Sequence, residues 1–238
     1  MFLRSRPNRR RIRRFLAAQA ERPLSYGEVG RSQGRPPAGY FFDCERGELG
    51  AGPDVWRAAC QALERWEMFR VGWATVAPRR PPLEVGREVA VVIGRLGLWT
   101  LNAARIVYVV DEDDGRVARR GFAYGTLPDH VERGEERFLV EWDRETDRVS
   151  YEIRAFSWPN HWITYCGFPV VRRFQAQFRR ASIRAMQRAV RGEKSRSRSQ
   201  RAAGFTPAVP VDLALPATLL RTWVAPTPPT SVHGGPPA

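Results

Sequence analysis

The sequence is poor in cysteine and in long apolar runs. Its three cysteines, Cys44, Cys60 and Cys166, stand far apart and form no CxxC pair, which argues against a zinc knuckle, a redox dithiol and a disulfide framework. No apolar run approaches the roughly 18 residues that a membrane-spanning helix needs. Arginines interrupt every candidate signal segment near the N-terminus. We therefore expect a cytoplasmic protein without a membrane span.

Lysine is almost absent as well, because Lys194 is the sole lysine among 39 basic residues. We attribute this bias to base composition, which makes the arginine count weak evidence for a nucleic-acid partner. The net charge of +14 is also concentrated in parts of the chain: residues 1–22 carry eight arginines and one acidic residue, and seven arginines lie between Arg172 and Arg191 without an acidic one. The stretch 23–169 is left mildly acidic.

Composition divides the chain into three parts. Residues 1–22 are predicted to form a basic, disordered arm, and residues 23–192 a single α+β domain. Residues 193–238 are rich in Ser, Arg, Pro and Gly and poor in periodic apolar positions, so they cannot bury enough surface to offset the entropy of ordering. We expect this tail to be disordered.

Hydrophobic periodicity predicts two helices in the domain. Val55, Ala59, Ala62, Trp66 and Phe69 recur at helical spacing after Gly52-Pro53, which indicates a helix over 53–69 that buries one face. The stretch 170–190 places apolar residues on one stripe and arginines on the others, which predicts a C-terminal helix about 30 Å long. The apolar stripe comprises Val171, Phe174, Phe178, Ala181, Ala185 and Ala189.

Between these helices the pattern is that of strands. Apolar and polar residues alternate in 137–143 and 148–156, and β-branched runs occupy 88–96 and 104–110. No helix-length amphipathic segment interrupts the region from Trp73 to Phe156, so five or six strands should form an antiparallel meander, preceded by a short strand near 40–42. The fold class predicted is α+β: a helix-grip-like curved antiparallel sheet wrapped on a long C-terminal helix, with one shorter helix after the first strand.

A sheet that curls around a helix leaves a concave, mostly apolar site between them. We therefore expect the domain to bind an apolar or amphipathic small molecule, with no metal or cofactor. Pro128 and Gly134 predict that the acidic stretch around His130 lies on a loop between two strands. The ligand-binding residues predicted are the aromatics of the strands with a polar anchor at the mouth: Phe122, Tyr124, His130, Glu135, Trp142 and Tyr151.

Two other functions stay open. His130 with Glu132 or Glu135 offers an imidazole beside carboxylates, which suits general acid–base chemistry in a hydrolase or isomerase, although no residue matches an established catalytic motif. The basic arms offer a surface for nucleic acid or for anionic lipid. The order GxxGxG in 47–52 does not match a dinucleotide-binding fingerprint, and we interpret it as a turn before the first helix.

Several motifs together resemble a known family. They are YGEVG at 26–30, GELGAG at 47–52, ALERWEMFRVGW at 62–73, GFAYGTLPDHVERGEERF at 121–138, AFSWP at 155–159 and the pair Arg172 and Gln175. In this combination the chain resembles uncharacterised protein family 0548 (domain-of-unknown-function family 1990) over residues 24–190. The resemblance implies kinship without implying a reaction, and it does not extend to the arms.

Overall fold

The computed structural model describes residues 1–95, 97–160 and 168–203. Its helical elements are α1 (Arg9–Ala17), η1 (Arg31–Gln33), α2 (Pro53–Glu64), η2 (Glu67–Phe69) and α4 (Phe168–Ala203). Its strands are β1 (Phe2–Leu3), β2 (Phe41–Ala51), β3 (Ala74–Ala77), β4 (Glu88–Arg95), β5 (Leu98–Asp113), β6 (Val117–Thr126), β7 (Glu132–Asp143) and β8 (Arg148–Pro159). Within these ranges, no helix is both long and apolar enough to cross a membrane.

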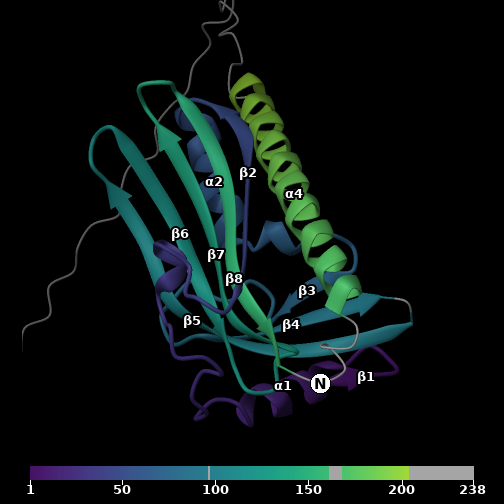
Figure 1. Ribbon diagram of the computed structural model, residues 1–238. Coiled ribbons are helices and arrows are strands. Elements are labelled where there is room, and N and C mark those ends of the chain that lie inside the picture. The colour runs from purple at the N-terminus through teal and green to yellow at the C-terminus, as the bar shows by residue number, and fades with distance from the viewer. Residues whose placement is uncertain (96, 161–167, 204–238) are drawn as a thin grey trace, which may run out of the picture.

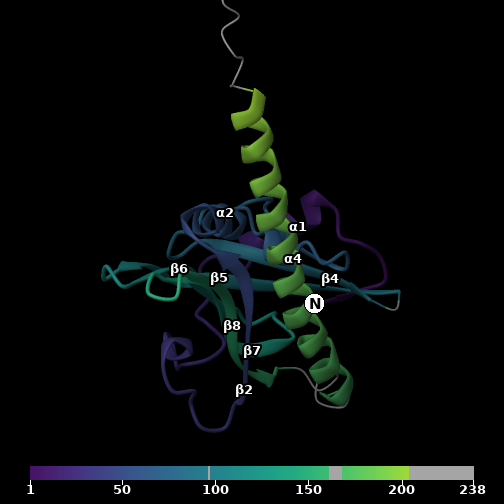
Figure 2. The same cartoon turned by 90° about the horizontal axis from the view of Figure 1, so that it is seen from above.

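The strands form one curved antiparallel sheet in the order β2-β8-β7-β6-β5-β4-β3, with β1 paired to β5 (Figure 1). The long helix α4 contacts β2, β8, α2 and η2. Viewed from above, it crosses the concave side of the sheet (Figure 2). The predicted α+β, helix-grip-like architecture is therefore confirmed, including the six antiparallel strands that follow the first helix.

The helix predicted over 53–69 corresponds to α2, which ends earlier than the periodicity predicts. Gly52, with φ of 88°, precedes Pro53 at the first helical position, which is a common start for a helix. α2 ends at Glu64 because Trp66 adopts a left-handed conformation with φ of 58° and begins η2. The Trp66 indole donates a hydrogen bond of 2.8 Å to the carbonyl of Pro81. All five apolar residues of the predicted stripe are nevertheless buried.

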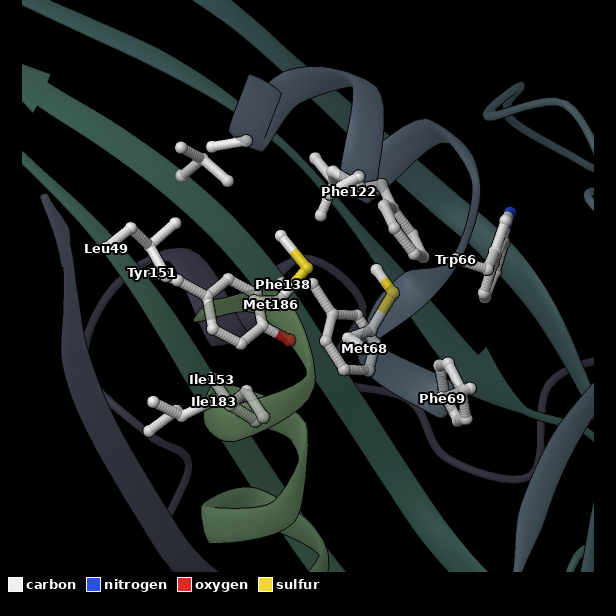
Figure 3. Packing of buried hydrophobic residues seen from close by; sticks show 14 of the residues in the cluster. Leu49, Trp66, Met68, Phe69, Phe122, Phe138, Tyr151, Ile153, Ile183 and Met186 are labelled. Carbon is white, nitrogen blue, oxygen red and sulfur yellow. The ribbon is translucent and has the colours of Figure 1, made fainter. Parts of the chain in front are cut away.

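The main core lies between the sheet, α2 and the second half of α4. Figure 3 shows Ile183 and Met186 of α4 turned toward Tyr151, Ile153 and Phe138 of the sheet, all of which are buried. The predicted stripe on this helix included the buried Ala185 but omitted Ile183 and Met186. Gly47 of β2 permits the close approach of the helix, because a Cβ atom there would lie 2.3 Å from the Ile183 side chain.

The prediction of a disordered arm at residues 1–22 is wrong. β1 pairs with β5, and α1 packs Phe15 against the face of β4 and β5 that points away from α4, where Leu3 is also buried (Figure 1). Asn8 caps α1 by accepting a 2.9 Å hydrogen bond from the Arg11 backbone N–H. A nine-residue amphipathic helix has little stability on its own, and α1 forms here because a sheet face is available for its apolar side to cover.

The last helix also extends past its predicted end and continues to Ala203. It therefore includes the first residues of the predicted tail. The remainder of that tail, 204–238, lies outside the described residues, as does Cys166. Of the described cysteines, Cys44 is exposed, and burial raises the pKa of the Cys60 thiol to about 12.

Candidate functional site

A cavity of about 460 Å³ lies between the concave face of the sheet and the first half of α4. Much of its wall is apolar and largely aromatic, as a site for a small organic molecule requires. The sheet, η2 and the segment before β3 contribute Phe69, Trp73, Val91, Ile93 and Tyr124, and α4 contributes Val171, Phe174 and Phe178. The first half of the predicted stripe on α4 thus faces this cavity.

Two carboxylates interrupt the apolar wall. Glu132 and Glu136 both line the cavity from β7, four residues apart and thus on the same face of the strand, which they share with Phe138 of the core. The prediction that these residues lie on a loop is wrong, because β7 begins at Glu132 and only 127–131 separate it from β6. The strand, not a loop, aims the two side chains inward.

Both carboxylates are held where ionisation is unfavourable. Burial raises the pKa of Glu132 to about 7, and burial likewise raises the pKa of Glu136 to about 7, with the charge of Glu132 adding to the second shift. The Tyr124 hydroxyl donates a short hydrogen bond to Glu136. Burial and the neighbouring carboxylate raise the pKa of Tyr124 well above its ordinary value, so this phenol stays protonated. Near neutral pH the two carboxyl groups can therefore release or accept a proton.

A chain of polar contacts orients the Glu132 carboxylate. Asp43 of β2 pairs with Arg172, at 2.5 Å and 2.8 Å, and with Arg179 at 3.0 Å. Arg172 also donates to the Gln175 side-chain oxygen at 2.8 Å, which leaves the Gln175 amide nitrogen to donate to Glu132 at 2.5 Å. Asp43 neutralises much of the arginine charge, so the polar end of the cavity is not strongly basic.

His130 lies beside this polar end and lines the cavity. Its Nδ1 atom accepts a 3.0 Å hydrogen bond from the backbone N–H of Glu132. The same Nδ1 atom lies 3.0 Å from the Glu132 carbonyl oxygen, so the backbone of Glu132 holds the ring. The ring is thereby fixed at the start of β7, where the sequence predicted an anchor at the mouth.

Glu135 also contributes to the cavity wall, but its carboxylate points to the other side of β7. It accepts hydrogen bonds from the Tyr26 hydroxyl at 2.7 Å, the Gly30 N–H at 2.8 Å, and the N–H and hydroxyl of Ser32. Gly125 leaves room for this arrangement, because a Cβ atom there would lie 2.2 Å from the Tyr26 hydroxyl oxygen. Glu135 therefore anchors the segment before β2.

The other three predicted ligand residues lie outside the cavity wall. Phe122 and Tyr151 are fully buried, and the Tyr151 hydroxyl lies 3.0 Å from the Ser182 hydroxyl. Trp142 stacks on Trp56 with ring centres 6.2 Å apart. The structure therefore places Tyr124, His130 and Glu135 around the cavity, Phe122 and Tyr151 in the core, and Trp142, partly buried, against the edge of the core.

Sequence reasoning missed four polar residues that line the cavity, namely Asp43, Glu136, Gln175 and Arg179. It also missed Arg172, which contacts Asp43 and Gln175 from outside the cavity wall. The signal for Glu136 was present, because its even spacing from Phe138 and Val140 puts it on their inward face. Arg172 and Gln175 stood out as a motif, but nothing local indicated that they face inward. Asp43 lies 129 residues before Arg172 in the sequence, so their pairing depends on the tertiary fold.

Fold and site together define an α+β, helix-grip-like domain with a mostly apolar cavity that two half-buried carboxylates line. The chain belongs to the family described as "Domain of unknown function (DUF1990)", whose model matches residues 25–185. It is 34% identical over 208 residues to a UPF0548 protein of Dictyostelium discoideum, which covers 80% of this chain and 96% of the relative. It is 36% identical over 169 residues to a UPF0548 protein of Deinococcus radiodurans, covering 66% and 82% of the two chains.

Solved structures are similar to this chain at low sequence identity. A hypothetical protein from Helicobacter pylori matches with a TM-score of 0.42 at 10% identity, covering 69% of this chain and 94% of that one. A norcoclaurine synthase of Thalictrum flavum matches with a TM-score of 0.39 at 10% identity, covering 66% and 99%. Scores this low give no basis for transferring a ligand or an activity.

Proposed function

We propose that this domain binds an amphipathic small molecule in the cavity between the sheet and α4. The observation that carries the proposal is a cavity of about 460 Å³ with an aromatic wall and a polar end. This volume falls in the range of small-molecule sites, about 300 to 1,000 Å³. An apolar body would pack against Trp73 and Phe178, and a polar group would meet Glu132 and Glu136.

The polar end favours a hydrogen-bond donor on the ligand. Glu132 and Glu136 are acceptors when ionised, and a donor or a cationic group brought to them would offset the unfavourable burial of their charge. His130 lines the same end of the cavity, so its imidazole would meet the polar group of the ligand. A molecule with one polar end and an aromatic or aliphatic body fits these requirements.

Native mass spectrometry on protein purified gently from its own host tests the proposal. We expect a retained small molecule, and we expect Ile93→Trp to abolish its retention because the added ring occupies cavity space. Val109→Trp on β5 is the matched control, since Val109 is 40% exposed and outside the cavity wall. A ligand retained equally by the wild type and Ile93→Trp would place binding elsewhere. An apo protein that no lipid or metabolite in a broad panel stabilises would refute the proposal.

A second candidate function is proton-transfer catalysis on the bound molecule. It is favoured by two carboxyl groups with pKa values near neutrality that face the same cavity, since a general acid or base works best when its pKa lies near the working pH. The sequence suggested His130 with either Glu132 or Glu135 for this chemistry, and we now propose Glu132 and Glu136. Glu135 is committed to the Tyr26 and Ser32 contacts.

The recovered ligand provides the test of catalysis. Incubation with the protein in deuterated water should introduce deuterium at a carbon position or change the mass of the ligand, and Glu132→Gln and Glu136→Gln should each suppress that change. Glu145→Gln, at an exposed position, should not. A ligand that binds and returns unchanged would restrict the domain to binding.

A further inference from the structure

Large apolar side chains are exposed at the mouth of the cavity. Phe2, Leu98 and Val170 line the cavity and are 41%, 54% and 53% exposed, and Met1, beside Phe2, is 38% exposed. They come from β1, from the start of β5 and from the first turn of α4, which meet at one end of the molecule (Figure 1). We refer to these four residues as the apolar mouth. Their exposure gives the cavity an opening that favours apolar surroundings.

Arginines without acidic partners lie beside this opening, on the N-terminal segment and on α1. The basic rim consists of the exposed residues Arg4, Arg6, Arg9, Arg10, Arg11, Arg13 and Arg14. In the part of the chain that the structure describes, none of them forms an ion pair with a carboxylate, whereas many arginines of the sheet and of α4 do. The charge of the rim is therefore available to an outside partner.

Contacts tie the basic rim to the apolar mouth. The Arg11 guanidinium lies 3.8 Å from the Met1 sulfur, and the Arg6 guanidinium lies 5.7 Å from the ring centre of Trp99, the neighbour of Leu98. Arg4 follows Phe2 by two residues. The apolar face of α1 is already used, because Phe15 packs on the sheet and leaves the arginines pointing outward. The positive charge therefore borders the opening on the side of β1 and α1.

We propose that this end of the molecule docks on an anionic lipid bilayer, with the basic rim on the headgroups and the apolar mouth in the interfacial region. Apolar side chains bordered on one side by arginines match the two contributions that bind peripheral proteins, insertion of apolar area and attraction to anionic lipid. Nucleic acid would use the arginines but would leave Leu98 and Val170 facing a polar backbone. The apolar mouth is what selects the bilayer.

Docking in this orientation would open the cavity toward the membrane. A lipid-like ligand could then enter or leave without crossing water. This consequence depends on the proposed ligand-binding function, because it has no use in a domain whose cavity takes no ligand. The docking itself does not depend on it, so the two are tested separately.

Vesicle flotation with the full-length protein tests the docking. We expect binding to vesicles of an equimolar mixture of phosphatidylcholine and phosphatidylglycerol, and at least tenfold weaker binding to phosphatidylcholine alone. Arg4→Glu with Arg11→Glu should weaken binding at least tenfold, since one arginine near an anionic surface contributes about fivefold. The matched control is Arg184→Glu with Arg188→Glu, which makes the same charge change on exposed positions of α4 away from the mouth.

Leu98→Asn separates the bilayer from other anionic partners. It should weaken vesicle binding severalfold and leave binding to duplex DNA unchanged. The proposal would fail if Arg4→Glu with Arg11→Glu abolished binding to DNA while Leu98→Asn left vesicle binding unchanged. The surface would then be a nucleic-acid site. Equal effects of the rim and control pairs would also overturn it.

The Ile93→Trp variant distinguishes the two proposals. It should still float with anionic vesicles while losing its ligand, because the substitution lies inside the cavity and not on the rim. A protein that binds a ligand but never floats would refute the docking alone. A protein that floats but never binds a ligand would refute the proposed function alone.

Discussion

Replacing Glu136 by glutamine should flatten the dependence of folding stability on pH around neutrality. The pKa of this carboxyl group is raised from 4.5 to about 7 in the folded protein. Below pH 4.5 the group is neutral in both states. As the pH rises further, the unfolded chain ionises first, so stability is lost progressively until the pH passes the folded-state pKa.

The size of the loss follows from the shift. A difference of about 2.5 pKa units at about 1.4 kcal/mol per unit makes the ionisation of Glu136 cost about 3 kcal/mol of unfolding free energy. Glutamine keeps the shape of the side chain, and its carbonyl oxygen can still accept the hydrogen bond from Tyr124. The variant should therefore equal the wild type below about pH 4 and exceed its stability by about 3 kcal/mol in mildly alkaline solution.

Urea unfolding followed by tryptophan fluorescence at a series of pH values measures this difference. Glu145→Gln is the control, since it removes an exposed carboxylate of the same chemistry. Its stability curve should run parallel to that of the wild type. If the stability curve of Glu136→Gln also ran parallel to that of the wild type, ionisation of Glu136 would not be unfavourable in the folded state. The reasoning on the polar end of the cavity would then be wrong.

Three further predictions concern the scaffold. Glu135→Ala leaves four donors without their acceptor and should lower the unfolding free energy by about 3 to 5 kcal/mol in urea, against less than about 0.5 for the exposed Glu145→Ala. Gly47→Ala should cost about 1 to 3 kcal/mol by calorimetry, and Ile183→Ala in the same chain should relieve part of that cost, so additive losses would contradict the clash. Deleting residues 1–22 should uncover an apolar sheet face and cost at least about 3 kcal/mol; unchanged thermal stability would mean that the arm contributes nothing.

The general fold could be predicted because its signals are local. Alternation in 137–143 and 148–156 identifies two central strands, and the absence of crossover helices leaves only an antiparallel sheet. The N-terminal elements could not be predicted in the same way. A two-residue strand and a nine-residue helix have little intrinsic stability, and they form here because β5 offers a free edge and an apolar face.

The site was harder to predict because turn residues can also occur inside a strand. Gly134 was interpreted as a loop glycine, yet it lies in β7 with φ of 144°, where a Cβ atom would lie 2.0 Å from the carbonyl oxygen of Phe156. The close approach of β8 requires a glycine at that point. Once the strand is extended back to Glu132, alternation alone sends Glu132 and Glu136 into the cavity.

The acidic residues of β7 therefore have two separate roles, because neighbouring residues of a strand point to opposite faces of the sheet. Glu135 faces one side of the sheet and holds the segment containing Tyr26, while Glu136 faces the other and meets Tyr124. Because the hydrogen bonds described for the two carboxylates have no partner in common, Glu135→Ala and Glu136→Gln should combine additively in unfolding free energy, within about 0.5 kcal/mol. A coupling larger than that in a double-mutant cycle would mean that the scaffold contact and the cavity carboxylate depend on each other. The anchor on one face of the strand would then be part of the site on the other.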